Sequence, residues 1–293
     1  MKRILLSGCS FSFGDELEWQ HVDNSEVETQ FDLGDRCISS IRDEKRFSNL
    51  LAEHYNCEVI NKSKCGASNQ WILRSLAEAY NSAKWTGQKY DLVIFQLTEL
   101  VRVDIKLSNG QIQSISALPR YCNDERSEEV KQRYSKKYLI PNLVGGFLYK
   151  HENTKHFKKT AIEMQEIADA YYLHVYSEEI SLENWWIYQY AFKHMFKDTP
   201  YIIIGKRPFE NRLPNQVAYK NMNDTVDFFL QGRENVLGIQ RGWENPRYCK
   251  RYSLKGKVNR TGGHPSALGH ELIAKKIIEV VNEKYPNLGK KTY

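Results

Sequence analysis

The sequence predicts a three-layer α/β/α sandwich around a mostly parallel sheet of about five strands, with a helical insertion between the third and fourth strands. Short apolar runs alternate with segments of helical spacing three times within about the first 100 residues, the rhythm of a doubly wound sheet. A fourth apolar run follows near residue 200, after a long charged segment. The length of 293 residues suits one large domain that carries an insertion.

The composition is that of a soluble globular protein. Hydrophobic residues make up 41%, aromatic residues 12% and charged residues 27%, which argues against disorder along the whole chain. No apolar run approaches the roughly 18 residues that span a bilayer, and Ile4–Leu6 is too short for a signal-peptide core, so we expect a cytoplasmic protein. The six cysteines lack C-x-x-C spacing and are expected to be free thiols. The net charge of +6 does not support a nucleic-acid partner.

The first strand is expected at Arg3–Ser7, a short apolar run that leads into the turn Gly8–Asp15. A strand followed by a small, glycine-bounded turn is how an α/β sheet presents a side chain at its carboxyl edge. Residues 47–55 then place apolar side chains at i, i+3, i+4 and i+8. This spacing predicts a helix with one buried face, packed on the sheet.

Two further strand-and-helix units follow. Cys57–Asn61 is the second strand candidate, and Ser68 or Asn69 in the next turn could cap a helix that runs to about Ser82. Asp91–Leu97 is a continuous apolar run, as expected of a strand covered on both faces of a parallel sheet. These units complete the first half of the predicted core.

The regular pattern is lost in the middle of the chain. From about residue 104 the sequence is rich in charge, and we interpret residues 104–197 as a mostly helical insertion that covers the mouth of the site as a lid. Residues 1–103 and 198–293 then form the α/β core.

The second half of this core contains three elements. Tyr201–Gly205 is the fourth strand candidate and Asn235–Ile239 is a weaker fifth. The last element is a helix that opens at His264 and buries apolar residues as far as Val281.

Small or polar residues follow the first three predicted strands. They are Ser10, Gly66 and Thr98, and His264 opens the final helix. The carboxyl ends of strands in an open α/β sheet meet at one crevice, so we expect these four residues to lie close together. A hydroxyl, a base that reaches it and donors for an oxyanion are the groups that nucleophilic acyl transfer requires.

Three blocks of the sequence resemble the SGNH hydrolase superfamily, whose members are also called GDSL lipases or esterases. The blocks are Gly8–Gly14, Cys65–Asn69 and Gly262–His270, and they occur in the order found in that family. The resemblance covers roughly residues 1–104 and 198–285. The amino-acid sequences of the last two blocks resemble those of SGNH-like proteins of bacteriophages and bacteria.

The resemblance implies a flavodoxin-like fold and a role for each matching residue. The first-block serine of the family is the nucleophile, which corresponds to Ser10. The second-block glycine supplies a backbone oxyanion donor, here Gly66, and the last-block histidine is the general base, here His264. The family mechanism requires neither a metal nor an organic cofactor.

The family usually has Asp before the serine, where this chain has Cys9, at a position that mainly shapes the turn. Two other positions depart from the family pattern. The family usually has an oxyanion-binding Asn in its third block, where this chain has Thr98, whose hydroxyl offers a single hydrogen bond. The family also commonly places an Asp two or three residues before the histidine, where this chain has Thr261 and Gly262. His264 therefore needs another partner to orient its imidazole. The candidates are Asp15, Glu99 and Asp224.

We therefore predict a serine esterase that uses a Ser10–His264 dyad on a small or carbohydrate-like ester or O-acetyl substrate. Arg102, one helical turn beyond Thr98, is a candidate for binding an anionic group of the substrate. His270 points to a different helical face from His264 and is expected to be a packed or capping residue. The alternative is a catalytically impaired protein that kept the fold and acts in binding or assembly through its basic charge and tyrosine-rich insertion.

Overall fold

A computed structural model describes residues 1–14, 44–64, 66–98, 102–108, 112–116, 175–206, 224–230 and 267–288, the strand pairs at 253–254 and 257–258, and positions 100, 110, 167, 170, 171 and 265. The chain forms two compact units. The first unit comprises Met1–Cys65, Ile72–Leu97 and Lys193–Tyr293, and the second comprises Gly66–Trp71 and Thr98–Phe192.

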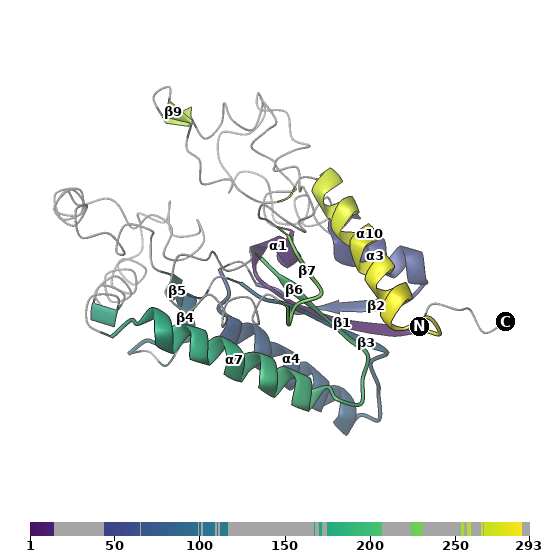
Figure 1. Ribbon diagram of the computed structural model, residues 1–293, viewed down its shortest axis with the longest axis horizontal. Coiled ribbons are helices and arrows are strands. Elements are labelled where there is room, and N and C mark those ends of the chain that lie inside the picture. The colour runs from purple at the N-terminus through teal and green to yellow at the C-terminus, as the bar shows by residue number, and fades with distance from the viewer. Residues whose placement is uncertain are drawn as a thin grey trace. The chain divides into compact units, whose positions relative to one another are not determined.

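The first unit is built on a parallel sheet of five strands in the order β2-β1-β3-β6-β7 (Figure 1). The strands are β1 (Arg3–Ser7), β2 (Glu58–Asn61), β3 (Leu92–Gln96), β6 (Tyr201–Gly205) and β7 (Phe228–Phe229). Numbered within this sheet, their order is 2-1-3-4-5, which is the flavodoxin-like arrangement. The predicted fold class is therefore confirmed.

Helices cover both faces of the sheet. On one face, α3 (Phe47–Tyr55) and α10 (Ala267–Lys284) pack side by side and share one core cluster with Ile4 and Leu6 of β1. Side chains alternate along a strand, so Leu5 and Ser7 face the opposite layer. There α4 (Asn69–Trp85) is anchored by a 2.6 Å hydrogen bond between the hydroxyl groups of Ser75 and Ser7. Because both faces are covered, all five residues of β3 are buried.

His270 caps helix α3 from the neighbouring helix α10. The backbone N–H of Phe47, the first residue of α3, donates to Nδ1 of His270 at 3.2 Å. The imidazole is fully buried and stacks on the Phe47 ring at a centroid distance of 5.8 Å. The N-terminal N–H groups of a helix have no partner within the helix, so this contact satisfies one of them. The prediction of a packed or capping histidine is confirmed.

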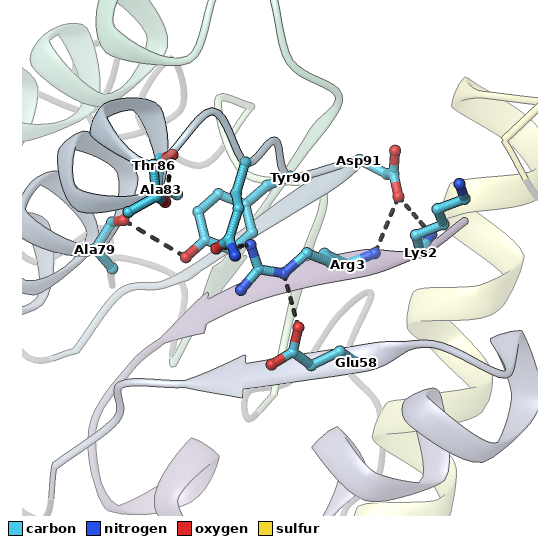
Figure 2. A network of polar contacts seen from close by, with 9 residues as sticks. Lys2, Arg3, Glu58, Ala79, Ala83, Thr86, Tyr90 and Asp91 are labelled. Atoms are coloured by element: carbon cyan, nitrogen blue, oxygen red, sulfur yellow. Dashed lines mark hydrogen bonds and ion pairs between the residues drawn. The ribbon is translucent and has the colours of Figure 1, made fainter.

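The amino ends of β1, β2 and β3 are joined by polar contacts (Figure 2). The guanidinium of Arg3 lies over the ring of Tyr90 at 5.1 Å and pairs with Glu58 of β2 at 2.7 Å. The carboxylate of Asp91, just before β3, accepts from the backbone N–H groups of Lys2 and Arg3. This network holds the register of the three strands at the edge opposite the predicted site.

Tyr285, directly after α10, joins that helix to the amino end of β6. Its hydroxyl donates to the carbonyl of Tyr201 at 2.9 Å and accepts from the Tyr201 N–H at 3.1 Å. The neighbouring residue Lys284 forms a second link to the sheet, because its Nζ pairs with Asp227, just before β7, at 2.8 Å. Burial lowers the pKa of Lys284, but the hydrogen bond and charge of Asp227 outweigh it, and the net pKa is raised.

We expect Tyr285→Phe to lower the free energy of unfolding by about 1–2 kcal/mol, because it removes the hydroxyl that bonds both the N–H and the carbonyl of Tyr201. Chemical denaturation measured by circular dichroism tests this. Tyr190→Phe is the matched control, since Tyr190 is 75% exposed and should tolerate loss of its hydroxyl. Equal stabilities of the two variants would contradict the assigned role.

The second unit contains an antiparallel hairpin of β4 (Arg102–Lys106) and β5 (Ile112–Ser116) and most of α7 (Glu178–Met195). The hairpin was not expected in an insertion read as mostly helical. Polar and apolar residues alternate in Arg102–Lys106, a two-residue period that selects a strand. The placement of Arg102 one helical turn after Thr98 is accordingly wrong.

Three further predictions concern the fifth strand, the cysteines and membrane-spanning segments. The fifth-strand candidate Asn235–Ile239 lies outside the described residues, and β7 takes the fifth place in the sheet. Neither Cys9 nor Cys57 is in a disulfide, and the other four cysteines lie outside the described residues. Within the described part of the chain, no helix has the length and apolar character needed to cross a membrane.

Candidate active site

Ser10 stands at the first position of a short helix directly beyond β1. The chain leaves β1, passes through Gly8 and Cys9, and begins α1 (Ser10–Phe13). Gly14 ends this helix in the left-handed region, at φ 81°, and its N–H donates to the carbonyl of Ser10 at 3.1 Å. A strand, a tight turn and a helix are the setting in which α/β hydrolases present a nucleophilic serine. Ser10 itself is only 3% exposed.

Gln96, the last residue of β3, holds the Ser10 turn in place. Its Oε1 accepts from the backbone N–H of Cys9 and from the hydroxyl of Ser12, both at 3.0 Å. Its Nε2 donates to the carbonyl of Leu97 at 2.6 Å, which fixes the orientation of the amide. The pairing of β1 with β3 brings Gln96 beside the turn, because Ser7 is opposite Phe95.

The glycine before this turn leaves room for these contacts. A Cβ on Gly8 would lie 2.5 Å from Oε1 of Gln96 and 2.5 Å from the hydroxyl of Ser12. Real Cβ atoms do not approach other atoms so closely. A larger residue at this position would therefore displace the Gln96 side chain or the Ser12 hydroxyl.

Asn61 supports the same turn from the end of β2. Its amide Nδ2 donates to the carbonyl of Ser12 at 2.9 Å and to the hydroxyl of Ser48 at 3.3 Å. The ends of β1, β2 and β3 therefore meet around Ser10. The sequence analysis assigned no role to Gln96 or Asn61, although a polar residue that closes an apolar strand was a usable signal.

In the second unit, Gly66 begins the segment that leads into α4. Its φ of 75° lies in the left-handed region, which suits glycine. Ser68, two residues later, caps α4, because its hydroxyl accepts from the N–H of Trp71 at 3.0 Å. Of the two predicted caps, Ser68 or Asn69, the structure selects Ser68.

Asn69 binds the backbone of Thr98 at both polar groups. The Thr98 N–H donates to Oδ1 of Asn69 at 2.7 Å, and Nδ2 of Asn69 donates to the Thr98 carbonyl at 3.3 Å. The Thr98 N–H is therefore already engaged. Its hydroxyl is buried and has no hydrogen-bond partner among the described residues. Thr98 can thus offer an oxyanion its hydroxyl but not its backbone N–H.

The hairpin of the second unit contacts the Gly66–Ser68 segment. Nη1 of Arg102 donates to the carbonyl of Ala67 at 3.4 Å. Asp104 Oδ1 accepts from the hydroxyls of Ser68 at 2.6 Å and Ser114 at 2.7 Å. Tyr188 of α7 is electrostatically coupled to the same carboxylate: burial raises the pKa of its phenol, and the negative charge of Asp104 adds to this.

The five predicted site residues are distributed over both units. Ser10 belongs to the first unit, and Gly66, Thr98 and Arg102 to the second, where Arg102 contacts the residue next to Gly66. His264 lies outside the described residues. Its candidate partners Asp15 and Glu99 lie outside them too, and Asp224 is exposed. In the described ranges, no group of three His, Cys, Asp or Glu residues could hold a metal ion.

No protein-family model and no curated protein matches the chain by sequence. The solved structures similar to it include two esterases and a putative lipolytic protein. An acetyl xylan esterase from Butyrivibrio proteoclasticus is 8% identical at a TM-score of 0.41, and the match covers 97% of this chain but only 64% of the esterase. A putative lipolytic protein of the G-D-S-L family from Desulfitobacterium hafniense is 14% identical at 0.32, with 96% and 99% coverage.

The psychrotrophic esterase EstA from Pseudoalteromonas is 9% identical at a TM-score of 0.37, and the match covers 98% of this chain and all of the esterase. Identities and TM-scores this low do not assign the chain to a family. The strand order and the strand–turn–helix setting of Ser10 show a flavodoxin-like α/β/α fold.

Proposed function

We propose that the protein is a serine hydrolase of the SGNH type that cleaves an ester or O-acetyl group by means of Ser10 and His264. The placement of Ser10 carries the proposal. It begins a helix at the carboxyl edge of a flavodoxin-like sheet, and polar residues from the ends of two neighbouring strands brace its turn. Ligands of open α/β sheets bind at this edge.

In the proposed reaction, Ser10 Oγ attacks the carbonyl carbon of the ester while His264 takes the hydroxyl proton. The tetrahedral intermediate expels the alcohol, which receives the proton from His264, and an acyl group remains on Ser10. Water, deprotonated by the same imidazole, then attacks this acyl-enzyme and releases the acid. The negative charge on the carbonyl oxygen is stabilised by the N–H groups of Ser10 and Gly66 and by the hydroxyl of Thr98.

Burial of the nucleophile favours small acyl groups. Ser10 is 3% exposed, so an acetyl group reaches its hydroxyl with less rearrangement than a long acyl chain would need. The substrate class is accordingly an acetyl or similarly short ester on a small molecule or a carbohydrate.

We expect a fluorophosphonate probe to label the native chain at one residue, and Ser10→Ala to abolish labelling. Such probes phosphonylate an activated serine hydroxyl and ignore ordinary ones. Ser82→Ala is the matched control, since Ser82 is an exposed serine of α4 outside the Ser10 turn, and this variant should still be labelled. Absence of labelling in the folded native chain would remove the hydrolase proposal and favour a binding or assembly protein.

A further inference from the structure

We propose that Asp104 and Ser114 of the β4–β5 hairpin are positioning residues for catalysis: they hold the Gly66–Ser68 segment so that the Gly66 N–H is oriented toward the oxyanion. This inference rests on the proposed hydrolase function. It adds to that function two residues of the insertion that make no contact with the reacting atoms.

Asp104 and Ser114 form a preorganised pair. They are directly opposite one another in the antiparallel register, so both side chains lie on the same face of the hairpin. The Ser114 hydroxyl donates to Oδ1 of Asp104 at 2.7 Å. Hydrogen bonds to a carboxylate are shorter and stronger than those between neutral groups, and this one fixes both rotamers.

Asp104 and Ser114 each form a hydrogen bond with Ser68. The Ser68 hydroxyl donates to the same Oδ1 of Asp104 at 2.6 Å, and the Ser68 backbone N–H donates to the hydroxyl of Ser114 at 3.1 Å. Ser68 is fully buried and Ser114 is 7% exposed, so water competes little for these bonds.

As a result, hydrogen bonds hold the peptide unit that lies one residue beyond Gly66. The peptide between Ala67 and Ser68 has two polar groups, its carbonyl and its N–H. Arg102 of β4 donates to the carbonyl, and Ser114 of β5 accepts from the N–H. A peptide unit is planar, so holding both groups fixes the orientation of the Ala67–Ser68 peptide and anchors the chain one residue beyond Gly66. Glycine needs such an external restraint because it has no Cβ to limit its backbone.

Capping of α4 does not account for this arrangement. Ser68 Oγ accepts from the Trp71 N–H whether or not it also donates to a carboxylate. Oδ1 of Asp104 accepts from the hydroxyls of Ser68 and Ser114, and the Ser114 hydroxyl accepts from the backbone N–H of Ser68. What these two residues hold in place is the segment that begins at Gly66.

The test compares kcat and KM for an activated acetyl ester in the full-length protein and in three variants. We expect Asp104→Ala and Ser114→Ala to lower kcat by about 10- to 100-fold with KM changed less than about twofold, because a misdirected donor weakens binding of the transition state only. Asp104→Asn should regain most of the lost kcat, since its Oδ1 still accepts from both serine hydroxyls.

Asp227→Asn serves as the control for simple destabilisation. Asp227 accepts from the Ile203 N–H at 2.8 Å and pairs with Lys284, so it is a structural carboxylate of the other unit. Its variant should unfold at a lower temperature with kcat unchanged. Unchanged kcat in both Asp104→Ala and Ser114→Ala, or a rise in KM in place of the fall in kcat, would overturn the positioning role.

The outcomes also separate this inference from the proposed function. An active native chain whose hairpin variants keep full kcat refutes the positioning role alone. A native chain that shows neither hydrolysis nor labelling of Ser10 refutes both. If Asp104→Ala fails to fold, Ser114→Ala decides, because it keeps the carboxylate and removes only the acceptor for the Ser68 N–H.

Discussion

Ser10→Ala and His264→Ala should each reduce ester hydrolysis by on the order of 10³-fold or more, and the double variant should be no slower than either single one. Residues that act as one catalytic unit lose their effect together, because neither contributes once the other is gone. The measurement is kcat/KM for an activated acetyl ester, with protein that retains its native circular dichroism spectrum.

The controls are residues of the same type at exposed positions. Ser82 and His54 lie on the surfaces of α4 and α3, and Ser82→Ala and His54→Ala should keep the native rate. If the Ser10 and His264 losses multiplied in the double variant, the two residues would act independently and the dyad would be wrong. A native rate of ester hydrolysis in Ser10→Ala or in His264→Ala would also show that the dyad is wrong.

Gly8→Ala should abolish the proposed hydrolysis without changing either residue of the proposed dyad. The new methyl would collide with Gln96 Oε1 and the Ser12 hydroxyl, which together fix the turn that carries Ser10. Overpacking of this kind costs about 1–3 kcal/mol of stability. A displacement of the nucleophile by about 1 Å lowers the rate by roughly 10²-fold. Thermal unfolding and kcat/KM measure the two effects separately.

Gly87→Ala is the contrasting control, at a glycine outside both the Ser10 turn and the hairpin. A Cβ there meets no atom within 4 Å, although its φ of 70° disfavours alanine. We expect this variant to lose some stability through backbone strain and to keep its catalytic rate. A native rate in Gly8→Ala would show that Gln96 does not need its present position to support Ser10.

The core could be predicted because its signals are local. The strands Arg3–Ser7 and Tyr201–Gly205 and the helix at 47–55 begin and end where the sequence analysis placed them. Strands buried on both faces must be continuous apolar runs, and a helix packed on one face must repeat its apolar residues every three or four positions. Each pattern is legible within one short segment.

The hairpin was missed although its alternation is also local. Arg102–Lys106 is only five residues long, so its two-residue period is easily outweighed by the charge farther along the insertion, as at residues 124–129. The prediction of a mostly helical insertion therefore lacks strands β4 and β5, which contact the Gly66–Ser68 segment.

Periodicity and turn residues are sufficient to predict the first four strands of the parallel sheet in their order along the chain and the position of Ser10 after the first strand. Only the tertiary structure decided which side chains meet. Gln96 reaches Cys9 across 87 residues and His270 reaches Phe47 across 223. Such pairs depend on strand order and register, and no local pattern contains that information because the partners become neighbours only when the sheet has assembled.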